Sequence, residues 1–228
     1  MALAWWLAYP EYGEPDLESA EIAIQTAIKA NVGNATLELA KIRWFFKRDT
    51  ATEAEQQQAY QLVSELVEST PDNSDAIYIL ALLTTHGFGV AASPQSGFEL
   101  QERSANLGNA DAMFELYAHY SNGLGVPADE ELAVKACQRA ADAGHSRAMY
   151  NIGAFNASGR GITKNIPEAI KWYERAADAG NPSAMAGLAA IYATGDGVDV
   201  DCEYAKQMFD QADYCGLDVS QMRKQVGL

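Results

Sequence analysis

The chain has 228 residues, 48% of them hydrophobic, so it is long enough to bury a sizeable core. Its 31 Asp and Glu residues outnumber its 16 Lys and Arg residues, which gives a formal net charge of −15. Such a surface repels nucleic acid and anionic lipid and favours a basic protein partner, although the same charge is equally typical of a soluble, well-solvated surface.

Residues 1–33 are predicted to form a degenerate capping unit. A short apolar helix carries Trp5 and Trp6, a turn follows, and Asp16 is placed to cap a second helix. Tryptophans at the end of a helical array more often seal the stack than bind a ligand. The apolar start lacks a basic segment and is interrupted at Pro10, so we predict neither a signal peptide nor a membrane span.

Residues 34–70 are predicted to form an irregular unit of two helices, the second running over about 51–69. The first helix ends in the segment 41–48, the only part of the chain that combines basic and aromatic side chains. That combination also occurs in nucleic-acid-binding helices, but the chain as a whole is acidic. We expect the basic side chains to pair with acidic neighbours and the aromatic ones to pack inward, and we keep Arg43 and Trp44 as candidate partner contacts.

Residues 71–216 repeat with a period of 36 residues. Three columns of small residues keep this step: Gly-x-Gly pairs begin at Gly87, Gly123, Gly159 and Gly195, single glycines stand at Gly108, Gly144, Gly180 and Gly216, and alanines at Ala76, Ala112, Ala148 and Ala184. Self-similarity at such a spacing is the sequence signature of a repeat architecture. The columns therefore predict a stack of repeated helical units.

Each repeat is predicted to hold two antiparallel helices, called helix A and helix B below. Helix A carries the alanine column with apolar residues one and two turns later, and the Gly-x-Gly pair ends it. Helix B follows a residue of a preferred N-cap type and ends at the single-glycine column. The predicted N-caps of helix B are Ser93, Asp129, Asn165 and Asp201.

The unit that begins at Ala148 resembles the Sel-one-like repeats, a family close to the tetratricopeptide repeats. It matches the family pattern at Ala148, Ile152-Gly153, Gly159, Gly161, Asn165, Ala169, Trp172-Tyr173, Ala176-Ala177 and Gly180, and departs from it at Asn156, where tyrosine is usual. The resemblance covers residues 72–216. It implies an all-α fold, a right-handed α/α superhelical solenoid of about six stacked antiparallel helix pairs. Members of the family serve as adaptors and scaffolds, and none of the repeat's motif residues is catalytic.

Residues 217–228 are predicted to form a short amphipathic C-terminal cap through Leu217, Met222 and Val226. The three cysteines have no paired spacing, which argues against a disulfide framework and fits a reducing compartment. We therefore predict a single repeat array over residues 1–228 in the cytoplasm, with a monomer favoured.

No convergent catalytic or metal-binding pattern emerges from the sequence. The histidines His86, His119 and His145 occupy different repeat columns and have no ligand spacing. The acidic run 196–203 suggests a calcium loop, but such a loop needs a glycine at the position after Glu203, where this chain has Tyr204. The Gly-x-Gly pairs lack the third glycine and the preceding strand of a dinucleotide-binding loop. We predict no enzymatic activity, no cofactor and no metal.

Helix A offers the candidate binding surface. Counted from the alanine column as zero, positions 0, 1, 4 and 8 fall on one side of the helix and positions 2, 6 and 9 on the other. Position 2 holds Tyr78, Phe114 and Tyr150, and position 6 holds Leu82, Ala118 and Ala154. Because helix A lines the concave face in related solenoids, this row predicts a groove for a helix or an extended segment. The alternative is that position 2 packs between repeats.

The resemblance to the Sel-one-like repeats implies two functions, and the acidic charge suits a basic partner in both. The first is a non-enzymatic adaptor that binds a partner protein or peptide through its concave face. The second is an immunity-type inhibitor that neutralises one dedicated, basic bacterial toxin or effector. An adaptor is expected to bind short peptides modestly, whereas an inhibitor binds one folded protein very tightly, with an association rate that falls steeply with salt.

Overall fold

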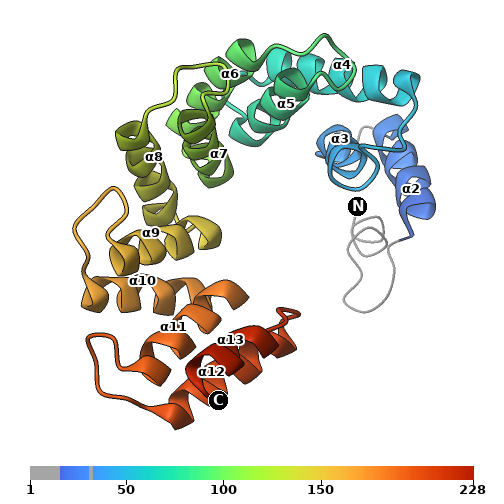
Figure 1. The fold of residues 1–228 in the computed structure, drawn as a ribbon. Helices are drawn as coiled ribbons and strands as arrows, with labels where there is room; N and C mark the ends of the chain where they lie inside the picture. The colour runs from blue at the N-terminus through green and yellow to red at the C-terminus, as the bar shows by residue number, and fades with distance from the viewer. Residues whose placement is uncertain (1–15, 31–32) are drawn as a thin grey trace. The chain divides into compact units, whose positions relative to one another are not determined.

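The computed structural model describes residues 16–30 and 33–228, and the regular secondary structure within them is all α-helical (Figure 1). The chain divides into two compact units, each considered by itself below. Unit 1 comprises residues 1–112 and 123–127, and unit 2 comprises residues 113–122 and 128–228. The predicted all-α fold of helical hairpins is confirmed. The predicted helix with Trp5 and Trp6 lies outside the described residues.

Unit 1 contains α2 (Leu17–Lys29), α3 (Ala35–Phe45), α4 (Glu53–Ser69), α5 (Ser74–His86) and α6 (Pro94–Asn106), and each helix packs against the next one along the chain. Asp16 caps α2 as predicted, because its carboxylate accepts the N–H of Ser19 at 3.0 Å. At the start of α4, the Thr52 hydroxyl accepts the N–H of Glu55 while the Glu55 carboxylate accepts the N–H of Thr52. This reciprocal pair of bonds satisfies two backbone donors that the first turn leaves free.

Unit 2 holds most of α7 (Ala110–Asn122), followed by α8 (Glu130–Asp142), α9 (Ser146–Ser158), α10 (Ile166–Asp178), α11 (Pro182–Thr194), α12 (Cys202–Tyr214) and α13 (Ser220–Val226). The hairpins α9–α10 and α11–α12 pack together, and α9 also contacts α11. From α5 to α12 each helix has 13 residues, and the starts of both helix A and helix B recur every 36 residues. The period read from the sequence is therefore the period of the helices.

The turns follow the columns of small and capping residues. All four predicted caps of helix B accept a backbone N–H of the first turn: Ser93 at 3.4 Å, Asp129 at 2.9 Å, Asn165 at 3.1 Å and Asp201 at 2.9 Å. The eight glycines of the Gly-x-Gly pairs have φ between +68° and +78°, a backbone conformation that favours glycine. Both signals were predicted correctly from the sequence.

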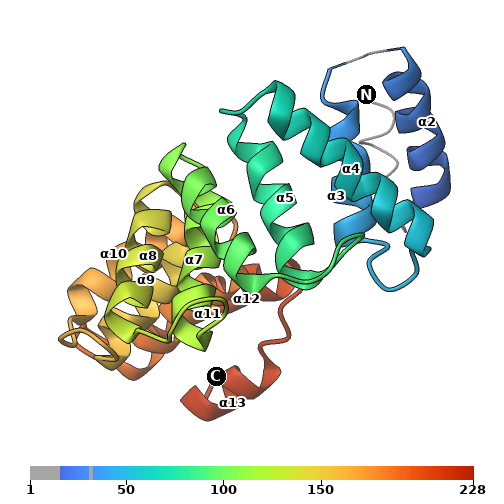
Figure 2. The same cartoon turned by 90° about the horizontal axis from the view of Figure 1, so that it is seen from above.

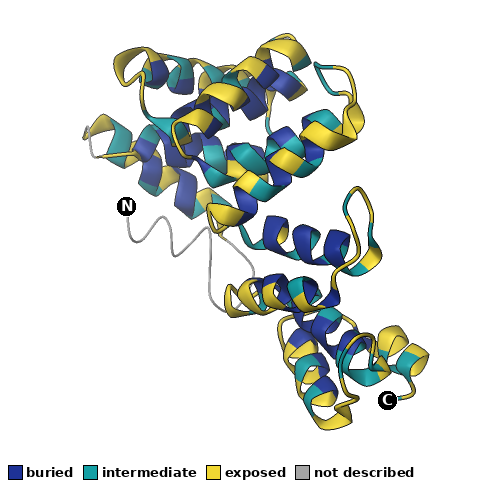
Figure 3. Cartoon of the chain, turned by 90° about the vertical axis from the view of Figure 1, so that its left-hand side faces the viewer, coloured by how far each residue is buried: buried dark blue, intermediate teal, exposed yellow. Residues whose placement is uncertain are grey.

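The alanine column lies inside the hairpins, since all four of its members have no exposed surface. Figure 3 shows that buried residues line the packed faces of the helices, while the connecting loops are largely exposed. Helix α5 is buried on nearly every side: between Ala76 and Thr85, only Tyr78 has appreciable exposed surface. A helix that is apolar all round has no solvent-facing stripe for periodicity to reveal.

The short helix α13 follows α12 at the C-terminal end of unit 2 (Figure 2). Leu217 and Val226 pack against an apolar cluster of α11 and α12, as expected for a cap, but Met222 is 39% exposed. Arg223 forms an ion pair with Asp210 of α12 and lies over the ring of Phe209, 5.4 Å from its centroid.

Candidate protein-binding surfaces

Phe114 of α7, one of the predicted aromatic contacts, packs against the following hairpin. Its ring stacks on His145 with centroids 4.4 Å apart, and the guanidinium of Arg147 lies 5.0 Å from its centroid. His145 is also the N-cap of α9, where its Nδ1 accepts the N–H of Ala148 at 3.2 Å. Phe114 therefore packs against neighbouring residues, the alternative given above for position 2. It is only half-buried, so part of it remains exposed to solvent.

Tyr150 of α9 has a similar position. It is half-buried and packs on Tyr173 of α10, with ring centroids 5.7 Å apart. Tyr173 fills space that two glycines leave open: a Cβ on Gly153 would lie 2.6 Å from its Cδ1, and a Cβ on Gly187 would lie 3.1 Å from its ring. Burial, together with the nearby Tyr150, raises the pKa of Tyr173 to about 12. Tyr150 thus covers a buried aromatic side chain.

The other helix A candidates differ in exposure. Tyr78, Ala118 and Ala154 are half-buried and keep some surface open to solvent. Leu82 is only 5% exposed and belongs to the apolar core of unit 1. Leu82 therefore has almost no surface for the partner contact predicted at position 6, because α5 packs against α3, α4 and α6.

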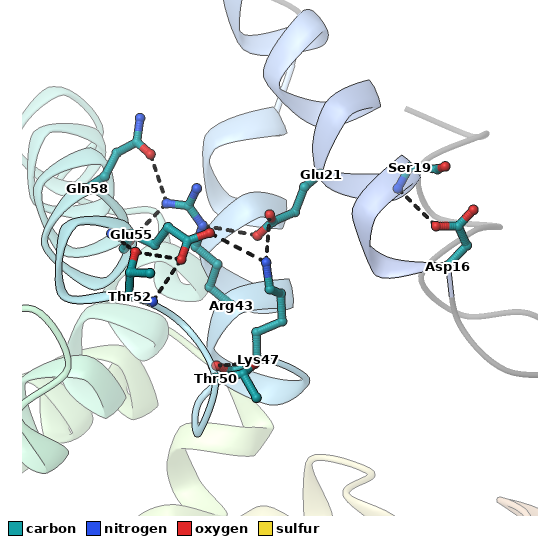
Figure 4. Close-up of polar contacts among 9 residues, drawn as sticks. All are labelled: Asp16, Ser19, Glu21, Arg43, Lys47, Thr50, Thr52, Glu55 and Gln58. Carbon is teal, nitrogen blue, oxygen red and sulfur yellow. Dashed lines mark hydrogen bonds and ion pairs between the residues drawn. The ribbon is translucent and has the colours of Figure 1, made fainter.

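Arg43 is the buried centre of a polar network that joins α2, α3 and α4 (Figure 4). Its Nε donates to the carboxylate of Glu21 at 3.1 Å. Its Nη1 donates to the backbone carbonyl of Glu55 and to Oε1 of Gln58, both at 2.9 Å. Lys47 donates to the other carboxylate oxygen of Glu21 at 3.0 Å. Arg43 is 1% exposed, so its inclusion among the candidate partner contacts is corrected: its donors are used inside unit 1.

Hydrogen bonds and ion pairs of this network shift the pKa values of Glu55 and Lys47. The pKa of Glu55 is lowered to about 2, mainly because the hydroxyl and the backbone N–H of Thr52 donate to its carboxylate. Partial burial acts to lower the pKa of Lys47, but the hydrogen bond and the charge of Glu21, with a smaller contribution from Glu55, raise it. Both groups are therefore ionised at neutral pH.

Trp44 is likewise a core residue. It is 6% exposed, and its ring lies 5.1 Å from that of His86 and 5.7 Å, edge-on, from that of Phe88. The predicted inward packing is confirmed for Trp44, which removes it from the candidate partner contacts. The prediction fails for the next residue, since Phe45 is 51% exposed.

The second half of unit 1 has a one-sided charge distribution in the sequence. Between residues 49 and 111 the chain has ten Asp or Glu residues and one basic residue, Arg103. The guanidinium of Arg103 donates to the backbone carbonyl of Pro71, which ties α6 to the turn between α4 and α5. Four exposed carboxylates stand within four residues of Pro71 or Arg103 in the sequence and are called the acidic surface below: Glu68, Asp72, Glu99 and Glu102.

Within residues 16–30 and 33–228, no group of three or more His, Cys, Asp or Glu side chains is placed to hold a metal ion. No helix of the same residues is long and apolar enough to cross a membrane. The cysteines Cys137, Cys202 and Cys215 are free thiols. Burial raises the pKa of the Cys137 thiol to about 12, so this thiol is protonated at neutral pH.

Comparison with known proteins identifies the repeat. The profile of the Sel1 repeat matches residues 74–109, 110–145, 146–181 and 182–212, which together make up more than half of the chain. The chain belongs to the Sel1 repeat family. The four matches begin where α5, α7, α9 and α11 begin, so each Sel1 repeat is one helix A with its helix B. Sel1 repeats are generally non-catalytic modules that bind protein partners.

Solved structures support the same assignment. A Sel1 repeat protein from Oxalobacter formigenes is similar with a TM-score of 0.73 and 25% identity, over 90% of this chain and 82% of that one. Immunity protein PA5088 from Pseudomonas aeruginosa is similar with a TM-score of 0.62 and 20% identity, over 98% and 84% of the two chains. The protective antigen c5321 of uropathogenic Escherichia coli gives 0.63 and 20%, over 96% and 54%. The last two likenesses show the fold alone, and no curated protein sequence matches the chain.

Sequence reasoning missed one feature of this Sel1 repeat protein. Glu53, Gln56 and Gln57, in the first turns of α4, line a groove that is described below. The signal was present in the sequence, since a run of three glutamines stands in a stretch without a basic residue from Asp49 to Glu102. It is weak as a pattern because glutamine runs on solvated helix faces are common.

Proposed function

We propose that this Sel1 repeat protein is a non-enzymatic binding module whose partner is a basic protein. The acidic surface carries the proposal: its four carboxylates are exposed, and the one basic residue of the same stretch, Arg103, is already bound to the carbonyl of Pro71. Complementary charge speeds association and disfavours wrong partners. Glu68 also lies in the last turn of α4, where no basic residue offsets the negative end of the helix dipole, so a cation from outside is favoured there.

Tyr78, Phe114 and Tyr150 remain proposed contacts, on the helix A face that the sequence predicts to be concave. Each is half-buried, so each still has ring surface for a partner. Changing all three to Ala tests this part of the proposal, with circular dichroism to check the fold. Loss of binding by a folded variant supports the aromatic contacts. Unchanged binding assigns the three rings to packing alone.

The main test compares two variants that remove the same amount of charge. In the first, Glu68, Asp72, Glu99 and Glu102 become the corresponding amides. In the second, four exposed acids of unit 2 are changed in the same way: Asp142, Glu174, Glu203 and Asp213. Partners are captured from lysate on the wild-type protein, identified and purified, and their affinities for the three proteins are measured by calorimetry.

The proposal expects the captured partner to carry net positive charge and to bind the first variant at least about tenfold more weakly, with the second variant close to wild type. The salt dependence of the association rate should also be smaller for the first variant. An acidic partner, or equal weakening by both variants, would contradict a specific role of the acidic surface.

An immunity-type inhibitor is the second candidate, favoured by the similarity in fold to an immunity protein over nearly the whole chain together with the acidic charge. Affinity separates the two candidates. An inhibitor is expected to bind one folded protein with a Kd of about 1 nM or tighter, whereas an adaptor binds several short peptides at about 1 μM or more weakly. The exposed thiols of Cys202 and Cys215 suit a reducing compartment, so the cytoplasm belongs to the same proposal and is tested by cell fractionation.

A further inference from the structure

A groove of about 390 Å³ opens on unit 1 between the start of α4 and the loop that follows α5. Its lining consists of Glu53, Gln56 and Gln57 from α4, and Gly87, Gly89, Val90 and Ala91 from the loop. The volume is large enough for a long side chain of a partner, and the lining is mostly polar. None of the contacts predicted from the sequence lies here.

The two segments that line this groove, the start of α4 and the loop after α5, are in direct backbone contact. Gly89 has a φ of +75°, and a Cβ built on it would lie 2.2 Å from the carbonyl oxygen of Gln56. The loop therefore rests on the α4 backbone itself, and any residue with a side chain would separate the two. A groove built on such a contact keeps its shape without a ligand, which lowers the entropic cost of binding.

The hydrogen bonds within the groove leave acceptors for a ligand. The Gln57 amide nitrogen donates to Oε1 of Glu53 at 3.2 Å, and the Gln56 amide nitrogen donates to the carbonyl of Ala51 at 3.0 Å. The amide oxygens of both glutamines and the second carboxylate oxygen of Glu53 remain as acceptors. Because Glu53 pairs with no cation within residues 16–30 and 33–228, the groove offers negative charge and oxygen acceptors together.

Elsewhere on α4, a carboxylate and an amide oxygen of this kind bind an arginine. Gln58, the third glutamine of the run, accepts from Arg43 through its amide oxygen. The same guanidinium is held by the carboxylate of Glu21 and the backbone carbonyl of Glu55 (Figure 4). One carboxylate, one amide oxygen and one backbone carbonyl thus accept from Nε and Nη1 of an arginine inside unit 1. In the groove, Glu53, Gln56 and Gln57 provide the same two kinds of acceptor, a carboxylate and amide oxygens.

We infer that the groove between α4 and residues 87–91 binds an arginine side chain of the basic partner. The planar guanidinium offers five N–H donors, which suits acceptors that are spread over separate groups better than the compact ammonium of lysine does. The inference rests on the proposed function, because it assumes that a basic partner exists. The chemistry of the groove itself does not depend on that assumption. The groove is tested first with small molecules for that reason.

The experiment is an NMR titration of the ¹⁵N-labelled full chain with N-acetyl-L-arginine amide. The expected result is a set of shifts confined to the backbone amides of residues 53–57 and 87–91 and to the Gln57 side-chain amide. The matched neutral probe is N-acetyl-L-citrulline amide, which has nearly the shape of the arginine probe without its charge. It should bind at least about tenfold more weakly, because a charge-assisted hydrogen bond is lost.

The control variant comes from the same helix. Glu65 accepts from Gln61 at 2.9 Å, so α4 carries a second carboxylate–amide pair, and Glu65 does not line the groove. Glu53→Gln and Glu65→Gln remove one charge each from exposed sites of α4. Glu53→Gln should weaken arginine binding about tenfold, and Glu65→Gln should leave it within about twofold.

Three outcomes overturn the inference: shifts spread over all acidic side chains, equal binding of the arginine and citrulline probes, or equal effects of Glu53→Gln and Glu65→Gln. The same two variants are then compared with the captured partner. A partner that binds both variants equally refutes the groove and leaves the proposed function standing. Arginine binding in the groove without any captured basic partner supports the groove and refutes the proposed function.

Discussion

The two units build the same hairpin around different interiors. Four residues after the small-residue column of helix B, unit 2 has Cys137, Tyr173 and Phe209, all of them buried. Unit 1 has Gln101 at this position, 1% exposed, and neither of its amide atoms has a hydrogen-bond partner among the described residues. A buried amide without partners destabilises the folded state, whereas the aromatic side chains of unit 2 add packing.

The two units also differ in how far their ion pairs are buried. In unit 1, Arg43 and Glu21 form a pair whose side chains are 2% and 10% exposed. In unit 2, pairs such as that of Lys164 with Asp196 are about half exposed, and pairs of this kind contribute little. The buried charge of unit 1 thus lies in α2 and α3, before the first Sel1 repeat, whereas the interiors of the repeats in unit 2 are held by packing.

The largest effect is expected from the buried charge of unit 1. Arg43→Ala should lower the free energy of unfolding by about 3 kcal/mol, because it removes the buried donor to one carboxylate oxygen of Glu21, while Lys47 still pairs with the other oxygen. Lys164→Ala in unit 2 should cost about 1 kcal/mol or less. Urea denaturation gives both values, and hydrogen exchange should show faster opening of α2, α3 and α4 only for the Arg43 variant.

Similar losses for these two variants would mean that the contrast between the units has no energetic basis. Arg43→Met serves as a control for lost packing, since it keeps most of the side-chain volume and removes the donors. It should remain destabilising, because Glu21 again loses its buried donor and keeps only Lys47 as a partner.

An intermediate effect is expected where α5 meets α6. A Cβ on Gly97 would lie 1.9 Å from the Thr85 hydroxyl oxygen, so Gly97→Ala should cost about 1–3 kcal/mol through overpacking. Thr85→Ala should be close to neutral, since the hydroxyl is buried and has no hydrogen-bond partner among the described residues. The double variant should recover part of the loss, because it removes the closest contact but leaves the Cβ and Cα of residue 85 within 2.9 and 3.0 Å; the equivalent positions of unit 2 combine Ala157 with Ala169.

The measurement is a double-mutant cycle of unfolding free energies for the two single variants and the double variant. Coupling of about 1 kcal/mol or more is expected for two residues in contact. Strictly additive effects would show that Gly97 is required for another reason, such as the conformation of the α6 backbone.

The smallest effect is a dependence on pH. Glu55 has a folded-state pKa of about 2 against an ordinary value of 4.5, so its contribution to stability is complete above about pH 4.5. That contribution disappears as the pH falls from about 4.5 toward 2, because the unfolded chain takes up the proton first. Thr52→Ala removes the donor hydroxyl and should flatten the dependence in this range. Thermal unfolding of both proteins between pH 2 and pH 6 measures it.

Ser93→Ala is the matched control for this prediction. Ser93 also caps a helix of unit 1 through its hydroxyl, but the third residue of that helix is Ser96 and not a carboxylate. The variant should lose about 0.5–2 kcal/mol equally at every pH in the range. A pH dependence that changes as much in Ser93→Ala as in Thr52→Ala would place its origin elsewhere.

The sequence predicted the frame well because the frame depends on local chemistry. Glycine is required where φ is near +70°, and Ser, Asp or Asn where a first turn needs an acceptor, so both residue types recur with the helices. The candidate site was harder to predict, because the exposure of a helix A residue depends on its neighbours in space. Leu82 and Trp44 are buried by packing that no period reveals, and Phe45 is exposed although it stands in an aromatic run.

The groove could not be predicted from spacing either. It requires Gly89 to meet Gln56 across 33 residues of sequence, and the repeat pattern shows that a glycine is needed without showing what it touches. The contacts of the buried Arg43 could not be predicted from spacing either. Arg43 was expected to pair with acids, but its bond to Gln58 follows from the way that α3 crosses α4.

The second glycine of each Gly-x-Gly loop also bears on how the chain folds. Gly89 meets Gln56, Gly125 meets Pro94, Gly161 meets Val134 and Gly197 meets Ile166, so every loop closes on the start of the helix B just before it. Contacts that reach back only one hairpin give a low contact order, which is typical of fast-folding helical proteins. Each new hairpin needs only its predecessor as a template, so order can spread along the chain as soon as any one pair of neighbours has formed.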